Sequence, residues 1–151
     1  MAHIVNQLSD DELDDFFSAG SSIGSYIIFP SNRINGGNTI NGARGMNHKI
    51  ADRFDLTLEC IRRHYLRQDS PLAKTLQRYA LFFDLFDSFR GYVDFFLLQD
   101  LVKNDYNAIR FYLPFDDFNS SPLPSNLNEY RNYRNGVMDF ISRRNNRIDN
   151  R

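Results

Sequence analysis

The chain has 151 residues, of which 42% are hydrophobic and 25% are charged. A chain of this length can bury a core of its own, and this composition excludes a wholly disordered protein. No apolar run approaches the roughly 18 residues that a membrane-spanning helix needs, so we expect no membrane partner. The lone Cys60 cannot form an internal disulfide, and the acidic N-terminus lacks the basic start of a signal peptide. We therefore expect one soluble domain, residues 1–151, in the cytoplasm.

The net charge is only −1, but the charges are distributed unevenly. Residues 1–30 carry five acids and no lysine or arginine, whereas residues 31–67 carry seven bases and three acids. Residues 68–120 are acidic, and residues 121–151 are basic again. Fifteen of the 18 bases are arginine, which suits forked contacts with carboxylate or phosphate, although a preference for arginine codons would give the same count. Different faces of the protein are therefore expected to meet different partners.

Both ends of the chain are predicted to be helical. Residues 9–20 form a short acidic helix, in which Ser9 caps the first turn and Glu12 completes a capping box. A basic helix is expected over residues 126–148, with Tyr130 and Phe140 on its buried side. Its wetter side carries five arginines, namely Arg131, Arg134, Arg143, Arg144 and Arg147.

Three short strands are predicted. Residues 25–29 are rich in β-formers and are followed by proline, and the Asn-Gly-Gly of residues 35–37 suits a hairpin turn. Residues 39–43 are then the return strand, and the glycines of residues 42–45 indicate a loop. Alternating apolar residues predict a third strand over residues 109–113.

The middle of the chain is predicted to be mostly helical. Residues 54–60 alternate as in a strand, but a longer stripe at helical spacing favours a helix over residues 52–68. Ser70-Pro71 is a strong helix start, and apolar residues continue that helix to Phe86. Residues 92–102 are interpreted as a buried helix, with a buried strand as the alternative. These elements predict an α+β fold, with a small antiparallel sheet of about three strands covered by four or five helices.

Six segments between Tyr26 and Ile148 resemble an uncharacterised family of bacterial and phage-borne proteins, a domain of unknown function. They are YIIFPSNRI, TINGARG, ADRFDLTLECIRRHY, GYVDFFLLQDLV, FYLPFDDF and RNNRI. The resemblance implies no particular reaction or ligand. It implies that the relatives have a longer N-terminal part. It also implies that this chain is a phage or mobile-element protein that acts on host defence.

The segment Asn41-Gly42-Ala43-Arg44-Gly45 is a candidate anion-binding loop. Glycines let backbone N–H groups approach an anion closely, and Arg44 adds a forked donor, with Asn41 and Asn47 beside it. The segment lacks the lysine and spacing of a phosphate-binding P-loop, so no nucleotide-binding fold is predicted. A structural turn is the alternative.

Carboxylates at helical spacing are the candidate catalytic groups. Asp52, Asp55 and Glu59 fall on one helix face, where Asp55 and Glu59 could act as acid, base or magnesium ligand. His48 is the candidate proton carrier. A salt-bridged surface, with Glu59 paired to Arg63, is the alternative. The three histidines and Cys60 have no metal-ligand spacing, so we expect no metal site and no cofactor.

Charged residues also interrupt a run that should be buried. The residues that interrupt it are Arg90, Asp94, Gln99 and Asp100. Buried charges need partners, for which Arg44, Arg53 and Arg62 are candidates. These residues either form an internal ion network or line a ligand pocket.

Two kinds of function follow from these patterns. We favour a non-enzymatic binding module that engages nucleic acid or an acidic protein through arginine-rich helix faces at residues 62–67 and 130–147. The alternative is a small enzyme acting on a nucleotide or phosphoester, with Arg44 as anion clamp.

Overall fold

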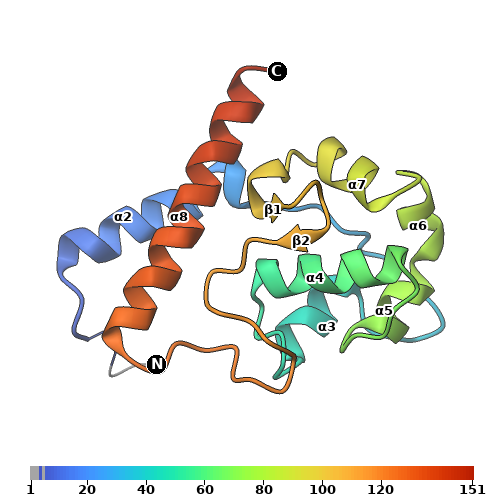
Figure 1. The fold of residues 1–151 in the computed structure, drawn as a ribbon, viewed down its shortest axis with the longest axis horizontal. Helices are drawn as coiled ribbons and strands as arrows, with labels where there is room; N and C mark the ends of the chain where they lie inside the picture. Colours follow the sequence, from blue (N-terminus) through green and yellow to red (C-terminus); the bar gives the residue numbers. More distant parts are fainter. Residues whose placement is uncertain (1–3, 5) are drawn as a thin grey trace. The chain divides into compact units, whose positions relative to one another are not determined.

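The computed structural model describes residue 4 and residues 6–151. The described residues form seven α-helices, two 3₁₀ turns and one two-stranded antiparallel sheet (Figure 1). The α+β class is therefore confirmed, with two strands where about three were predicted. None of these helices is long and apolar enough to cross a membrane. Contacts divide the chain into a terminal unit (the chain up to Ile27, with residues 112–114 and 123–151) and a central unit (residues 28–111 and 115–122).

The terminal unit is built on helices α2 (Asp10–Gly20) and α8 (Leu127–Asp149), which pack against each other (Figure 1). The predicted capping box is present: the Ser9 hydroxyl accepts from the Glu12 amide at 3.2 Å, and the Glu12 carboxylate accepts from the Ser9 amide at 3.3 Å. Asn126 caps α8. A small core joins the two helices, formed by Ile4, Leu8 and Tyr130 with Leu13 and Leu127. Both predicted terminal helices are confirmed.

The strand predicted at residues 25–29 is wrong. A 3₁₀ turn, η1 (Ile23–Ser25), packs against α8 instead. The Gly24 amide donates to Asn145 Oδ1 at 2.6 Å, and Arg144 Nη1 donates to the Gly24 and Tyr26 carbonyls at 3.1 and 2.6 Å. Side chains of α8 therefore occupy backbone groups that a strand would offer to a neighbouring strand.

Helix α4 (Phe54–Tyr65) is the centre of the second unit, and it confirms the helix over the strand alternative. All residues from Asp55 to Ile61 are buried. The helix packs against α5 (Ala73–Arg78), α7 (Phe89–Phe95) and strand β2 (Ala108–Ile109). This all-round burial explains why its sequence also alternates like a strand: both sides of the helix face protein.

The return strand predicted at residues 39–43 and the loop predicted at 42–45 are also wrong. These residues form helix α3 (Ile40–Met46). The Thr39 hydroxyl caps it by accepting from the Gly42 amide at 3.1 Å, and Ile40 is fully buried. The turn at residues 35–37 is present, with Gly36 at a φ of 72°, but it leads into a helix. A cap and one buried side chain outweigh the cost of two glycines in a helix.

The helix predicted from Ser70 to Phe86 is divided in two. Tyr79, with φ −106° and ψ 24°, ends α5 and precedes α6 (Ala80–Asp84). It is buried, and its hydroxyl donates to the Asn32 carbonyl at 2.7 Å. The predicted buried stripe is confirmed at Leu72, Leu76, Tyr79 and Phe83.

The helix predicted at residues 92–102 is partly correct. Helix α7 begins at Phe89, because the Ser88 hydroxyl accepts from the Gly91 amide at 3.0 Å, and it ends at Phe95. A 3₁₀ turn, η2 (Gln99–Leu101), and strand β1 (Val102–Lys103) follow. β1 pairs antiparallel with β2, with Val102 opposite Ile109, so the strand predicted over 109–113 is reduced to its first residue.

Candidate functional site

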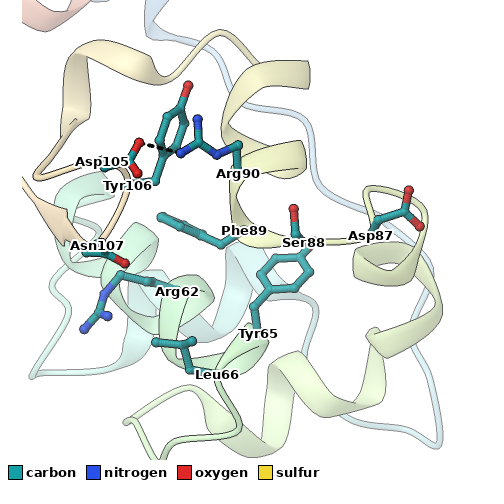
Figure 2. Close-up of a pocket in the computed structure, with 10 residues that line it drawn as sticks. All are labelled: Arg62, Tyr65, Leu66, Asp87, Ser88, Phe89, Arg90, Asp105, Tyr106 and Asn107. Carbon is teal, nitrogen blue, oxygen red and sulfur yellow. Dashed lines mark hydrogen bonds and ion pairs between the residues drawn. The ribbon is translucent and has the colours of Figure 1, made fainter.

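A pocket of about 440 Å³ lies between the C-terminal end of α4, the start of α7 and the turn between β1 and β2. Its volume is within the range of small-molecule sites. Figure 2 shows Tyr65 and Phe89 near its centre and polar groups around them. We call it the Arg90 pocket; it is lined by Arg62, Tyr65, Leu66, Asp87, Ser88, Phe89, Arg90, Asp105, Tyr106 and Asn107.

Arg90 is already paired on the wall of this pocket. Its Nη2 lies 2.5 Å from Asp105 Oδ1, and its guanidinium lies 3.9 Å from the centre of the Tyr106 ring (Figure 2). The hydrogen bond to Asp105 raises the pKa of Arg90. The Tyr106 hydroxyl donates to Asp94 at 2.6 Å, so Asp94 supports the wall without lining the pocket. Asn104, Asp105 and Tyr106 all have positive φ angles of 52 to 68°, which places this wall on a left-handed turn.

Arg62 is paired in the same way. It donates from Nε and Nη2 to Glu59 Oε1 at 2.8 and 2.6 Å, and Glu59 is 3% exposed. Arg63 Nε lies 3.8 Å from the same carboxylate. The structure thus brings the predicted ligand residues Arg62 and Arg90 to one pocket, but each guanidinium already holds a carboxylate.

A second hollow, of about 840 Å³, lies beside the end of α4 and along α5. We call it the basic groove; it is lined by His64, Arg67, Gln68, Asp69, Ala73, Lys74, Gln77 and Arg78. Arg67 and Lys74 are exposed. Among the described residues, no carboxylate lies within ion-pair distance of Arg67, Lys74 or Arg78. Among the described residues, no internal ion pair therefore neutralises these three cations.

Local backbone geometry positions the groove cations. Arg67 has a φ of 59° and follows the last turn of α4, where the Gln68 amide closes the helix on the Arg63 carbonyl at 2.8 Å. Arg78 donates to the Asn38 carbonyl at 3.2 Å. A Cβ on Gly37 would lie 2.5 Å from the Arg78 guanidinium carbon, so any other residue at position 37 would displace the Arg78 guanidinium from this place.

His64 borders the groove, and its surroundings favour the neutral form of its ring. Burial lowers its pKa below the ordinary 6.5, and the nearby Asp84 carboxylate opposes that shift only in part. Its ring lies 5.0 Å from that of Phe83. It therefore packs against the core and leaves the positive charge of the groove to the lysine and the arginines.

The predicted anion-binding loop has a structural role at Arg44. Its Nε donates to the Thr57 hydroxyl at 3.0 Å, Nη1 to Asp52 Oδ1 at 2.8 Å, and Nη2 to the Asp52 carbonyl at 2.9 Å. These bonds fasten α3 to the start of α4. Asn41 is exposed on α3, and the side chain of Asn47 accepts from the Lys49 amide at 2.9 Å.

The candidate catalytic carboxylates are buried and bonded. Asp55 is fully buried, and both its oxygens accept from Arg53, which is itself 5% exposed. Asp52 precedes α4 and is exposed, so it does not share the face of the other two carboxylates. His48 is exposed in the turn after α3. Within the described part of the chain, no three His, Cys, Asp or Glu side chains are arranged to hold a metal ion.

Cys60 is a core residue. Its side chain is fully buried on α4, and that burial raises the pKa of its thiol to about 11. A thiol that stays protonated at neutral pH is a poor nucleophile.

The arginines of α8 were predicted to be solvent-facing, and this is wrong for Arg144. It is 7% exposed and bonds the backbone of η1. Arg131 and Arg134 both donate to the Glu12 carboxylate, which lowers the pKa of Glu12 to about 2. The last two of the five are exposed: Arg143, which pairs with Asp139 at 3.0 Å, and Arg147.

A family model matches residues 1–148, almost the whole chain. The chain belongs to the Family of unknown function (DUF6994). This confirms the resemblance to an uncharacterised family. Neither the comparison with curated proteins nor that with solved structures found a match.

Two groove residues of this DUF6994 chain were not predicted from the sequence. Lys74 and Arg78 lie four residues apart on α5, with Gln77 beside them. Their spacing of four residues, on the helix that follows the basic residues 62–67, was the signal in the sequence. The buried apolar stripe of the same helix is the stronger pattern, and it says nothing about the polar side.

Proposed function

We propose that the chain is a non-enzymatic, cytoplasmic binding module that holds nucleic acid in the basic groove. The observation that carries the proposal is that Arg67, Lys74 and Arg78 line one hollow without a carboxylate partner among the described residues. Lysine and arginine side chains that are not held in internal ion pairs contribute most to the affinity for nucleic acid. When they neutralise phosphates, the counter-ions condensed on the nucleic acid are released.

The lining of the groove favours nucleic acid over an acidic protein. Apart from the cations it offers the amide side chains of Gln68 and Gln77, which can donate to phosphate or sugar oxygens. Its one carboxylate is that of Asp69, against three cations. Ala73 is its one aliphatic side chain. Protein partners are held mainly by large buried aromatic or apolar anchors, and this surface has no pocket-lining residue of that kind except the half-buried His64.

The alternative of a small enzyme acting on a nucleotide or phosphoester has less support. It needs a carboxylate that can reach a substrate, and Asp55 and Glu59 are buried in bonds to arginine. It also needs Arg44 as an anion clamp, and that side chain is bonded to Thr57 and Asp52. These groups stabilise the fold.

The test compares two double substitutions that remove the same charge. Arg67→Gln with Lys74→Gln neutralises the groove, and Arg143→Gln with Arg147→Gln neutralises the exposed side of α8. Binding of labelled single-stranded and duplex RNA and DNA is measured by fluorescence anisotropy over a range of salt concentrations. The groove variant should bind about tenfold or more weakly, with a salt slope smaller by about 0.7 to 0.9 for each phosphate that is no longer neutralised. The α8 variant should keep the affinity and slope of the unmodified chain.

Two results would contradict this function. Failure to bind any of the four polymers at low salt would exclude nucleic acid, and binding of a Glu-rich peptide under the same conditions would then assign the groove to an acidic protein. An equal loss of affinity in both double variants would show that nucleic acid is attracted by the positive charges of the whole surface and has no binding site in the groove.

A further inference from the structure

Helices α6 and α7 carry an exposed apolar surface that the proposed function does not use. Leu81 is 84% exposed, Leu85 74% and Phe95 58%. Half-buried phenylalanine rings lie next to them: the Phe86 ring is 5.0 Å from that of Phe95 and 5.3 Å from that of Phe82. We call this surface the α6–α7 face, formed by Leu81, Phe82, Leu85, Phe86, Phe95 and Phe96.

The four phenylalanine rings of this face form one connected group, and the two leucines adjoin it along the chain. Leu81 lies on α6 and Leu85 directly follows its last residue, four residues after Leu81 and three after Phe82, so helical spacing places Leu85 next to both. The Phe96 ring continues the patch, at 5.2 Å from Phe86 and 5.0 Å from Phe95. Single exposed leucines are ordinary on protein surfaces, whereas contiguous exposed apolar groups of this kind mark interaction sites.

The charged residues beside the patch are almost all acidic. Asp84 and Asp87 are exposed and adjoin Leu85 and Phe86 in the chain, and Asp94, next to Phe95, is exposed and accepts from the Tyr106 hydroxyl. Among the described residues no lysine or arginine lies within ion-pair distance of these three carboxylates. The one base between Tyr79 and Val102 is Arg90, which is paired with Asp105. The patch is therefore apolar at its centre and negative at its edge.

We propose that the α6–α7 face docks a basic amphipathic helix of a partner protein. The apolar side of that helix would cover Leu81, Leu85 and Phe95, and its flanking lysines or arginines would meet Asp84, Asp87 and Asp94. An amphipathic helix laid on an apolar surface is a common mode of recognition, and complementary charge at the rim selects the partner.

The same charges argue against other occupants. A two-fold pairing of this face with a second copy places the same patch on both sides, so acids would face acids. Nucleic acids and anionic membranes would be repelled by the three carboxylates. Charge complementarity thus selects a basic protein segment, and this binding is independent of the basic groove.

The test uses two amphipathic helical peptides with the same leucine face, one with lysines on its polar side and one with glutamates. Binding of each labelled peptide is measured by fluorescence anisotropy. The lysine peptide should bind at least about tenfold more tightly than the glutamate peptide, and Asp84→Asn with Asp87→Asn should reduce that difference. Leu81→Ser with Leu85→Ser should weaken binding of the lysine peptide at least about tenfold, because buried anchors carry most of the energy of such interfaces.

A matched control is available in the same unit. Ile28 is 74% exposed, as Leu85 is, and Ile28→Ser should leave peptide binding unchanged. The leucine variant should keep its unfolding midpoint and its affinity for nucleic acid, which separates this site from the groove. Equal binding of both peptides, or unchanged binding in the leucine variant, would overturn the proposal. So would a dimer, detected by sedimentation, that the leucine substitutions dissociate.

Discussion

The basic groove and the α6–α7 face are neighbouring surfaces of opposite character, built from successive helices of one unit. Among the described residues, the three cations of the groove have no carboxylate partner, and the three carboxylates around the leucines and phenylalanines of the face have no cation partner. The surface changes from basic to apolar and acidic at Tyr79, where α5 ends and α6 begins. Charges that lie inside the unit, such as Asp55 and Glu59, are paired. Interior charges therefore hold the fold, whereas the charges of the groove and of the face have no opposite charge within ion-pair distance among the described residues.

The largest expected effect is on a paired interior charge. Asp55→Ala leaves the buried Arg53 guanidinium without its carboxylate and should lower the free energy of unfolding by about 3 to 5 kcal/mol. Asp52→Asn is the control, because that carboxylate is 69% exposed, asparagine accepts the φ of 61° at this position, and Arg44 keeps its bonds to Thr57 and to the backbone carbonyl of residue 52, so the loss should be about 1 kcal/mol. Urea unfolding measures both. Equal losses of unfolding free energy in the two variants would mean that interior ion pairs stabilise the fold no more than surface ion pairs do, which contradicts this account.

The next effect distinguishes the leucine under the groove from the leucine on the face. Leu76 on α5 is fully buried, so Leu76→Ala should cost about 2 to 5 kcal/mol. Leu81 on α6 is 84% exposed, so Leu81→Ala should stay within about 0.5 kcal/mol. Thermal unfolding followed by circular dichroism compares the two. A large loss for Leu81→Ala would show that this leucine packs inside the protein and would remove the proposed docking surface.

Elements with a cap and a long helical stripe could be predicted from the sequence. Ser9 and Glu12 fix the start of α2, and the apolar spacing through residues 50–65 identifies α4 against its strand-like alternation. The strands were less predictable, because β-forming residues are used elsewhere: side chains of α8 bond the backbone near Gly24, and Thr39 caps a helix that contains two glycines. Such outcomes depend on residues distant in the chain.

The candidate site was partly predictable for a related reason. The sequence indicated Arg62 and Arg90 as pocket residues and residues 62–67 as a basic face, and the structure places both arginines at one pocket. The sequence does not reveal which arginine has a carboxylate nearby, since that depends on how helices pack. Arg44 and Arg144 are held by bonds inside the protein, whereas Arg67 has no carboxylate partner in the described part of the chain, although all three are the same residue type.

A smaller effect is the pH dependence of the unfolding free energy that arises from His64, which borders the basic groove. Burial lowers the pKa of His64, so below about 6.5 the unfolded chain binds a proton that the folded chain resists. The free energy of unfolding should therefore fall as the pH decreases from 7 through 6.5 and below. His64→Gln should make this fall less steep. Chemical unfolding across that pH range measures the slope, and identical slopes in both proteins would mean that His64 is solvated like the histidine of an unfolded chain.

The most direct test of the two-surface account is chemical-shift mapping on the ¹⁵N-labelled chain. A single-stranded oligonucleotide and the lysine–leucine peptide are titrated separately, and the perturbed backbone amides are assigned. The account predicts that the oligonucleotide shifts amides around residues 64–78, whereas the peptide shifts amides around residues 81–96. Perturbation of the same residues by both ligands, or of α8 by the oligonucleotide with residues 64–78 unchanged, would contradict it.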